Sequence, residues 1–302
     1  MSKKPLVSVV MNCLNGERYL KQSIKSIVNQ TYKDWELIFW DNASEDNSKN
    51  IFKKFKDKRL KYFYFKKRIP LYSSRNLALK KCKGKFIAFL DQDDLWSIDK
   101  LEKQIPLFKN SKVGLVYSNF WKYNQKKLFS KRLAIKESLP KGEITNNLLK
   151  KYVTGLITIV IRKKLIEKTK KVFDPQYNML ADLKFILNFS TKCEFDCIQE
   201  PLATYRYHPN QMSKKLFSTS VVQHLKWINS KSEVKKFKKY KEYKYLVNRV
   251  IFMQIAELLD RNLKIQAIKK ILEYPTNIYK IKLVLKLIMP KSIFIFLFGE
   301  IY

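Results

Sequence analysis

The sequence is poor in acidic residues, glycine and histidine, and it has no long apolar run. Its 302 residues include 26 Asp and Glu against 62 Lys and Arg, which gives a formal net charge of +36. Only six glycines and nine prolines are present, so a collagen-like or linker-like chain is excluded. No uninterrupted apolar run reaches about 18 residues, which argues against a conventional membrane-spanning helix. Compact helices and strands are therefore expected.

The positive charge does not by itself identify a partner. Nucleic acid, an anionic membrane face and a phosphorylated substrate all present fixed negative charge. A genome with AT-biased codons, rich in Lys, Ile and Asn, would also produce much of the excess. The chain is 46% hydrophobic and 14% aromatic, which excludes a disordered basic tail or a histone-like binder. No helix-turn-helix, RNA-recognition or zinc-finger pattern is recognisable, so specific nucleic-acid binding is not expected.

The cysteines and the N-terminus indicate a cytoplasmic protein. Cys13, Cys82, Cys193 and Cys197 are few and scattered, as expected for free thiols in a reducing compartment. The basic start and short apolar stretch superficially resemble a signal peptide, but the stretch contains Asn12 and lacks a small-residue cleavage pattern. We interpret it as the first strand.

Apolar runs rich in β-branched and aromatic residues alternate with helical patterns through the first 120 residues. This alternation is typical of βαβ units around a mainly parallel sheet. The expected strands are residues 6–11, 36–40, 60–65 and 86–90, and the expected helices are residues 18–29 and 73–82.

The second half is less regular. Strands are expected at residues 115–120 and 156–161, a helix at 181–189 and an extended stretch at 195–207. Beyond residue 214 the pattern changes to helices dense in Lys and aromatics. We therefore expect one domain over residues 1–213 and a helical, basic region over residues 214–302.

Polar residues follow three of the expected strands. Asn12 and Asn15 follow the first, Asp41 the second, and Asp91 and Asp93 the fourth. Open α/β sheets bind ligands at the carboxyl ends of their strands, so these side chains should converge on one crevice. An Asp-x-Asp pair there can hold a hard divalent cation against a diphosphate, although a solvated turn gives the same pattern.

Five motifs over about the first 100 residues resemble, in order and spacing, an inverting family 2 glycosyltransferase of the GT-A fold. They are Asn12-x-x-Asn15-Gly16, Gln30-Thr31-Tyr32, Asp41-Asn42-Ala43-Ser44, Arg75-Asn76-Leu77-Ala78-Leu79 and Asp91-Gln92-Asp93-Asp94. The resemblance implies an α/β, Rossmann-like fold with a mainly parallel sheet flanked by helices, followed by the C-terminal helical extension. It also implies a nucleotide-binding half over about residues 1–112 and an acceptor half over about 113–213.

The resemblance assigns donor-binding roles residue by residue. Asp41 matches the acid that contacts the nucleoside, usually uridine, although it could also be a helix cap. Arg75 matches a basic residue near the donor diphosphate, with a surface cation as the alternative. Asp93 matches the metal ligand and Asp91 the ligand of the ribose or metal. Asn12 and Asn15 complete the expected nucleotide-sugar site, and Mg²⁺ or Mn²⁺ is the expected cofactor.

Three further assignments lie outside these motifs. Asp182 is the candidate catalytic base, but Ala181 stands where the family usually has Glu, and a helix-capping role is the alternative. His208, in a Tyr-Arg-x-His element, is expected at the metal or diphosphate, unless it is an ordinary loop histidine. Trp96 either stacks on a sugar or packs in the core.

The C-terminal region offers a membrane anchor. Residues 281–289 are apolar except for Lys282 and Lys286, and residues 292–298 form another apolar run after Pro290. Lysines that snorkel toward anionic headgroups would suit an interfacial helix. A helix pair packed on the catalytic domain, or on another subunit in a homo-oligomer, is the alternative.

The expected function is metal-dependent, inverting transfer of a sugar from a nucleotide-diphosphate sugar, usually a UDP-sugar, to a hydroxyl of a glycan or lipid-linked glycan. The resemblance implies a bacterial surface-polysaccharide pathway, and the basic charge suits a cytoplasmic enzyme held peripherally on the inner face of the cell membrane. A sugar nucleotidyltransferase is not expected, because its Gly-rich phosphate loop is missing. The remaining alternative is a nucleic-acid- or membrane-binding protein with a degenerate, inactive glycosyltransferase fold, which Ala181 would favour.

Overall fold

A computed structural model describes residues 6–124, 131–167, 169 and 171–298, and it divides the chain into two compact units. The first unit contains the chain up to Thr145 and Val153–His208, and the second contains Asn146–Tyr152 and the chain from Pro209 onward. The sequence pattern instead indicated a division after residue 213. It also gave no sign that residues 146–152 leave the first unit.

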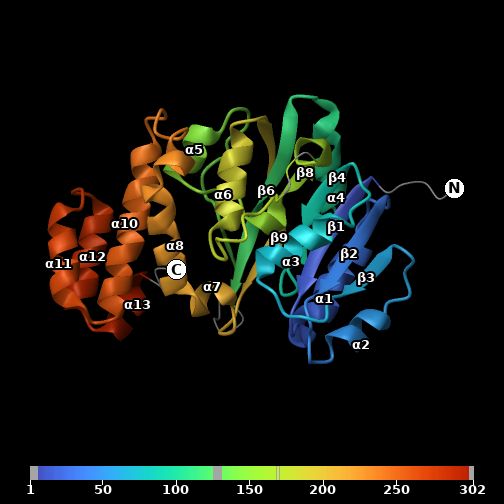
Figure 1. The fold of residues 1–302 in the computed structure, drawn as a ribbon, viewed down its shortest axis with the longest axis horizontal. Coiled ribbons are helices and arrows are strands. Elements are labelled where there is room, and N and C mark those ends of the chain that lie inside the picture. The colour runs from blue at the N-terminus through green and yellow to red at the C-terminus, as the bar shows by residue number, and fades with distance from the viewer. Residues whose placement is uncertain (1–5, 125–130, 168, 170, 299–302) are drawn as a thin grey trace. The chain divides into compact units, whose positions relative to one another are not determined.

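The first unit begins with four parallel strands in the order β3-β2-β1-β4 (Figure 1). These strands are β1 (Val7–Cys13), β2 (Trp35–Asp41), β3 (Leu60–Tyr64) and β4 (Phe86–Phe89), and the helices between them are α1 (Glu17–Val28), α2 (Ser48–Lys53) and α3 (Leu71–Leu79). The four predicted strands are confirmed to within two residues at each end.

The rest of the sheet is mixed. β8 (Val160–Arg162) runs antiparallel to both β4 and β6 (Val113–Asn124), and β9 (Glu194–Tyr207) runs parallel to β6. The short strands β5 (Leu95–Trp96) and β7 (Lys131–Leu133) pair antiparallel with β9 and β6. Helices α4 (Lys100–Gln104) and α6 (Ala181–Ser190) belong to this half.

The expected strand at residues 156–161 is wrong over its first half. Leu156–Thr158 forms a 3-10 turn, which the Thr158 hydroxyl closes by donating to the carbonyl of Gly155 at 2.7 Å. All three turn residues are buried, so their apolar character reflects burial and carries no information about strand geometry. The strand begins only at Val160.

Alternation along β1 separates the two faces of the sheet. Val7, Val9 and Met11 belong to the buried core that also contains Leu20 and Ile24 of α1. Asn12 points to the other face, where its amide meets Ser74 of α3. Successive residues of β1 face opposite sides of the sheet, and helices pack on both sides. The ends of the strands are the places where polar groups remain.

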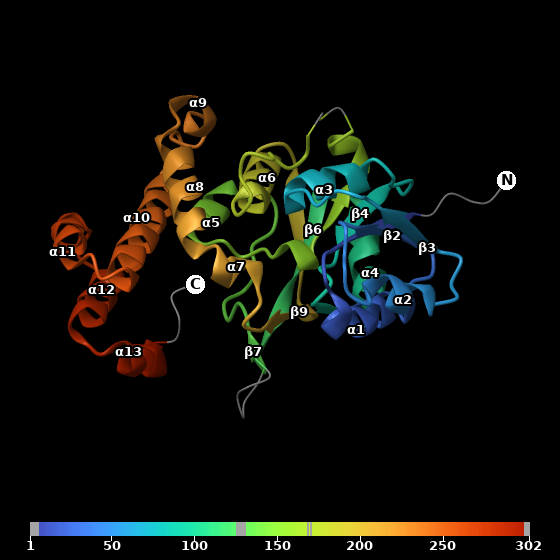
Figure 2. The ribbon, with the colours of Figure 1, turned by 60° about the horizontal axis from the view of Figure 1, so that its bottom comes forward.

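The second unit is helical (Figure 2). Its helices are α5 (Thr145–Lys150), which crosses the division, α7 (Met212–Lys215), α8 (Phe217–Asn229), α9 (Lys231–Val234), α10 (Tyr243–Asp260), α11 (Lys264–Glu273), α12 (Ile278–Ile288) and α13 (Lys291–Phe298). α10, α11 and α12 share a small core that includes Ile255, Ala267, Ile271 and Leu283. Among the described residues, no helix has the length and apolar character needed to cross a membrane.

Candidate active site

The carboxyl ends of β2, β1 and β4 meet at one edge of the sheet. Cys13 at the end of β1 pairs with Asp41 at the end of β2, and Val10 pairs with Phe89 at the end of β4. The loops that follow these parallel strands therefore start side by side. The predicted convergence of the polar strand ends is found in the structure.

Asp41 organises the turn after β2. Its side chain is buried, Oδ1 accepts the N–H of Ser44 at 2.8 Å, and Oδ2 accepts the hydroxyl of Tyr62 at 2.6 Å. Burial, followed by the bond to Asp41, raises the pKa of Tyr62, which keeps the phenol protonated as a donor. The turn contains Ala43 at φ 63°, a strained position for a residue with a side chain. Asp41 thus holds a turn and does not cap α2, which begins at Ser48.

Asn15 braces the loop after β1 against that same turn. Its backbone lies in the left-handed region at φ 53°, which Asn tolerates better than most residues. Its N–H donates to the hydroxyl of Ser44 at 3.1 Å, and its Oδ1 accepts the N–H of Glu45 at 2.9 Å. In this structure, the observed contacts of Asn15 are within the protein.

Asn12 presents an acceptor at the same edge. Its Nδ2 donates to the Ser74 hydroxyl at 3.0 Å, while its Oδ1 is buried and has no hydrogen-bond partner. Buried polar atoms normally have partners, so Asn12 Oδ1 is an acceptor that a water or a bound molecule is able to satisfy.

Gln92, between the two acids of the Asp-x-Asp pair, ties the acidic loop to the loop after β1. Its Oε1 accepts the N–H of Leu14 at 2.8 Å and its Nε2 donates to the carbonyl of Leu14 at 3.2 Å. An added Cβ on Gly16 would lie 2.6 Å from Gln92 Oε1, so the Gln92 amide would have to shift away from Leu14. The sequence interpretation gave no role to Gln92, because one amide between two acids carries no spacing signal.

Arg75 of α3 forms an ion pair with Asp91. Because Arg75 is only 2% exposed, the surface-cation alternative is wrong. Burial raises the pKa of Asp91, Arg75 opposes this rise, and the charges of Asp93 and Asp182 add to it. The carboxylate of Asp91 is thus partly recessed: 36% of its side chain is exposed, and the buried cation of Arg75 holds it.

Asp93 and His208 are brought together from positions 115 residues apart. His208 Nε2 and Asp93 Oδ2 are separated by 2.9 Å, and the ring of Tyr19 packs on the imidazole at a centroid distance of 4.9 Å. The antiparallel pairing of β5 with β9 explains the meeting, because it places the acidic loop beside the end of β9. The contact places His208 at the Asp-x-Asp pair, and its role there stays a prediction.

Asp94 and Arg206 support this pair and were missed as site residues. Both are buried, and Asp94 Oδ1 accepts the backbone N–H of Arg206 at 2.9 Å. The guanidinium of Arg206 donates to Gln22 at 2.5 Å and lies 5.1 Å from the ring of Tyr19. A signal was present: Arg206 lies only two residues before His208 at the end of an expected extended stretch, where alternate residues face the same side.

Asp182 lies in the first turn of α6, where its Oδ1 accepts the N–H of the next residue at 2.8 Å. The residue that precedes the helix is Leu180, which makes no capping bond, so Asp182 is not its N-cap. Its charge reaches Asp91, as the pKa of that carboxyl shows. Ala181, in place of the expected Glu, is buried in the protein interior.

Asn76 fixes the segment before α6 to α3. Its Nδ2 donates to the carbonyl of Phe173 at 2.6 Å, and its Oδ1 accepts the N–H of Phe173 at 3.0 Å. Both side chains of the Arg-Asn motif therefore have a structural contact: Arg75 binds the acidic loop, and Asn76 binds the segment that leads to Asp182.

Trp96 packs in the core, in agreement with the packing alternative. It is 5% exposed, and its Nε1 donates to the carbonyl of Ile157 at 2.8 Å. Lys100 Nζ lies 4.4 Å from the ring centroid. These contacts leave Trp96 no exposed face for a sugar.

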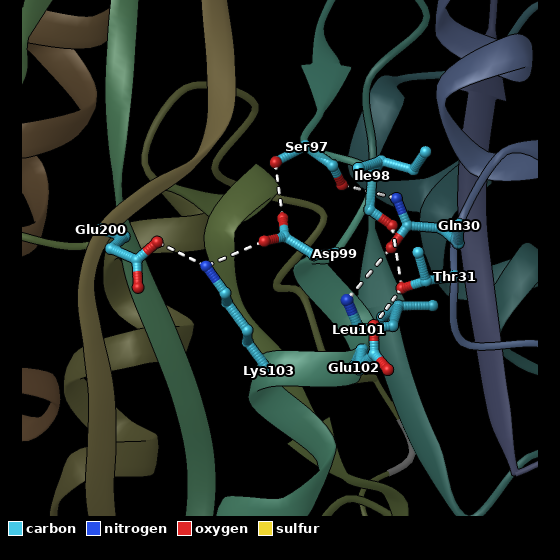
Figure 3. A network of polar contacts seen from close by, with 9 residues as sticks. All are labelled: Gln30, Thr31, Ser97, Ile98, Asp99, Leu101, Glu102, Lys103 and Glu200. Atoms are coloured by element: carbon cyan, nitrogen blue, oxygen red, sulfur yellow. Dashed lines mark hydrogen bonds and ion pairs between the residues drawn. The ribbon is translucent and has the colours of Figure 1, made fainter.

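The Gln-Thr-Tyr motif secures the chain that follows the acidic loop (Figure 3). Gln30 is fully buried, and its Nε2 donates to the carbonyls of Ser97 and Ser26 while its Oε1 accepts the N–H of Leu101. The N–H of Thr31 donates to the carbonyl of Ile98 at 2.9 Å. The end of α1 is thereby fixed to the segment between β5 and α4, which explains a motif that has no charged group.

The donor set of Asp93 and His208 fits a divalent metal ion. Asp93 supplies a carboxylate oxygen and His208 an imidazole nitrogen, both of which are ligands of divalent ions, and the two atoms lie 2.9 Å apart in direct contact. Within the described residues, no group of three or more His, Cys, Asp or Glu side chains has the arrangement of a metal site. Further ligands would have to come from a substrate or water.

Comparisons of sequence identify the family. The sequence model of glycosyl transferase family 2 matches residues 8–168. The glycosyltransferase WfgD of Escherichia coli, named as a UDP-Glc:alpha-D-GlcNAc-diphosphoundecaprenol beta-1,3-glucosyltransferase, is 32% identical over 215 residues, which are 70% of this chain and 81% of WfgD. TuaG of Bacillus subtilis, a putative teichuronic acid biosynthesis glycosyltransferase, is 29% identical over 70% of this chain and 82% of its own length.

Solved structures share the fold. S. aureus TarS residues 1–349 in complex with UDP align with a TM-score of 0.58 at 17% identity, over 84% of this chain and 81% of that one. The mannosyltransferase PcManGT of Pyrobaculum calidifontis, solved with GDP-Man and Mn²⁺, aligns with a TM-score of 0.56 at 15% identity, over 76% and 66% of the two chains. At these identities the likeness concerns the fold, a mixed α/β sheet with flanking helices.

Proposed function

Because the chain belongs to glycosyl transferase family 2, we propose that it is an inverting, metal-dependent enzyme that moves a sugar from a UDP-sugar to a hydroxyl of a glycan or lipid-linked glycan. The observation that carries the proposal is the meeting of Arg75, Asp91, Asp93 and His208 at the carboxyl edge of the sheet, with Asp182 in electrostatic range. The name of WfgD, which specifies a UDP-sugar donor and a diphosphoundecaprenol acceptor, supports this substrate class.

Donor binding would use the edge next to β1 and β2. Asp41 and the free acceptor Oδ1 of Asn12 would receive N–H or O–H groups of the nucleoside. Asp91, held by Arg75, would accept a ribose hydroxyl. Asn15 would support this site by holding the loop in place.

In the proposed reaction, the acceptor hydroxyl oxygen bonds to the anomeric carbon from the side opposite the donor diphosphate. The bond between that carbon and the diphosphate oxygen breaks, and UDP departs with the bonding electrons. Asp182 accepts the hydroxyl proton, which is the role of a general base. Asp93 and His208 would hold Mg²⁺ or Mn²⁺, which when bound would neutralise charge on the departing diphosphate.

The natural acceptor class implies a place for the enzyme. A lipid-linked glycan is anchored in a bilayer, so the proposal includes a cytoplasmic enzyme held at the inner face of the cell membrane, within a surface-polysaccharide pathway. All four cysteines are free thiols in the structure, as suits a reducing compartment.

The test is a panel of nucleotide sugars, assayed for hydrolysis and transfer with and without Mn²⁺. Asp182→Asn should lower turnover by about 10² to 10⁴-fold while UDP binding is retained. Asp93→Asn should remove the Mn²⁺-dependent part of UDP binding as well as turnover. Asp57→Asn, which alters a carboxylate that pairs with Arg59 outside the site, is the matched control.

Near-normal turnover by the Asp93 and Asp182 variants would refute these assignments. No hydrolysis of any nucleotide sugar by the wild type, together with salt-sensitive RNA binding, would favour the inactive-fold alternative.

A further inference from the structure

The helices α11–α13 expose most of the large apolar side chains found on the surface of the described residues. Eleven of the fifteen such side chains lie in these helices. They are Ile265, Ile268 and Leu272 of α11, Ile278, Tyr279, Ile281, Val284 and Ile288 of α12, and Ile293, Leu297 and Phe298 of α13. Soluble proteins rarely expose apolar side chains in such concentration unless the surface binds something.

In α11 the exposed apolar residues lie on one face, and in α12 all of them except Tyr279 do so. In α11, Ala267 and Ile271 are buried in the core shared with α10, whereas Ile265 and Leu272 are 75% and 72% exposed. In α12, Leu283 is buried and Ile288 is 68% exposed. The inner faces of α11 and α12 account for packing within the unit, so the outer rows require another explanation.

The charges around these rows are almost all positive. From Arg261 to Phe298 the sequence has eight Lys and Arg and a single acid, Glu273. On a helix with 100° per residue, Lys264 and Lys269 lie on opposite sides of the Ile265–Ile268–Leu272 row, each about 70° from its centre. Both lysines are exposed. Basic residues that flank an apolar row are the pattern of a helix that lies in a membrane interface.

Two lysines of α12 make contacts inside the second unit. The sequence pattern suggested Lys286 for headgroup contact, and Lys280 lies near it. Lys286 pairs with Asp260 at 2.8 Å, and Lys280 donates to the carbonyls of Leu272 and Tyr274. The expected snorkelling of Lys286 is therefore wrong in this structure. The α11 row, which the sequence interpretation did not include, supplies the flanking lysines.

We propose that the exposed apolar row of α11 binds an anionic lipid bilayer, with Ile265, Ile268 and Leu272 immersed and Lys264 and Lys269 at the headgroups. Charge decides between a bilayer and a second copy of the chain. Each copy has an excess of seven positive charges from Arg261 to Phe298, so two copies would repel each other here. Anionic headgroups would instead be attracted, at about 1 kcal/mol or fivefold in affinity per lysine near the surface. The proposal deepens the membrane position proposed above, and it does not depend on catalysis.

Co-sedimentation of the full chain with vesicles tests this surface. Vesicles of phosphatidylcholine with 30 mol% phosphatidylglycerol, as against pure phosphatidylcholine, should capture the wild type. The triple variant Ile265→Ser/Ile268→Ser/Leu272→Ser should bind at least about tenfold more weakly, since each change removes buried apolar carbons. Lys264→Ala/Lys269→Ala should lose about fivefold per lysine on the anionic vesicles only.

The control is Val222→Ser/Tyr245→Ser, which removes exposed apolar side chains from α8 and α10 and should bind like the wild type. Hydrolysis of a soluble UDP-sugar should be equal in all these proteins, which separates this surface from the active site. Wild-type binding by the triple variant would overturn the proposal. If the wild type does not bind anionic vesicles but forms a dimer, and the triple variant stays monomeric, the surface binds a second copy of the chain and the proposal is overturned.

Discussion

Replacement of Lys100 by methionine should change how the stability of the protein depends on pH. Lys100 is completely buried at the start of α4, and its Nζ donates to Gln104 Oε1 at 2.5 Å. Burial lowers the pKa of Lys100 well below its usual value, because an ammonium ion loses its hydration there. The nearby ring of Trp96 favours the charged form, but a cation–π contact contributes only about 0.5–2 kcal/mol. The loss of hydration is the cause of the lowered pKa, so the folded protein releases the Lys100 proton at a lower pH than the unfolded chain does.

The sign of the effect follows from the proton count in each state. In the unfolded chain Lys100 has an ordinary pKa of about 10.4, whereas in the folded protein its pKa is lower, so between these two pKa values the folded state holds fewer protons. The unfolded state therefore binds one more proton between the lowered pKa and pH 10.4, and the free energy of unfolding rises with pH by up to about 1.4 kcal/mol per unit. From pH 8 to pH 9.5 this amounts to about 2 kcal/mol.

Lys100→Met removes that proton and keeps a side chain of similar length. The unpaired Oε1 of Gln104 adds a cost of about 1–3 kcal/mol, but this cost is the same at every pH. The stability of the variant relative to wild type should thus fall by about 2 kcal/mol between pH 8 and pH 9.5. Urea denaturation followed by tryptophan fluorescence measures both proteins, and contributions from all other titrating groups cancel in the difference.

Lys109→Met is the matched control, because Lys109 is exposed and its replacement should give a difference that does not change with pH. A constant difference for Lys100→Met as well would refute the reasoning, since it would mean that the buried amine keeps its proton in the folded protein.

Three further changes test the contacts that position the site. Gln30→Ala removes the hydrogen bonds to the carbonyls of Ser26 and Ser97 and to the N–H of Leu101; it should cost about 2–4 kcal/mol in urea denaturation, and a loss below 1 kcal/mol would contradict that role. Asn76→Ala, which frees the chain that leads to α6, should lower kcat for transfer with little change in UDP binding by calorimetry; unchanged kcat would count against the link. Gly84→Ala puts a methyl group 2.6 Å from the backbone nitrogen of Ser8 and should lower stability by about 1–3 kcal/mol. An unfolding temperature equal to that of the wild type would show that β1 moves to accommodate the methyl group.

Much of the nucleotide-binding half was predictable because its signals are local. Strand β1 reads as a continuous buried run, and Asp41 directly follows the apolar run of β2. Parallel neighbours end at the same edge of a sheet, so the order of strands and acids was enough to predict that Asn12, Asp41 and Asp91 converge. The core position of Trp96 was less predictable, because an aromatic ring after an acidic loop suits either a sugar or a core.

The second half was harder because its contacts join distant parts of the chain. Strand β5 has two residues, too few for a pattern, yet its antiparallel pairing with β9 brings His208 to Asp93 and Arg206 to Asp94. The buried turn Leu156–Thr158 has the same apolar composition as a strand. Likewise, the spacing of Lys282 and Lys286 does not reveal that Asp260 takes one of them.

The sequence by itself determined the kind of protein, since five ordered motifs and the alternation of strands and helices indicate a family 2 glycosyltransferase without any knowledge of distances. Tertiary structure alone decided which partner each charged side chain has. Arg75 pairs with Asp91 and Lys286 with Asp260, because a charge that is taken out of water needs a partner. The apolar row of α11 stays exposed, because no other described part of its unit packs on it. Those choices depend on how distant segments pack, and local sequence does not record them.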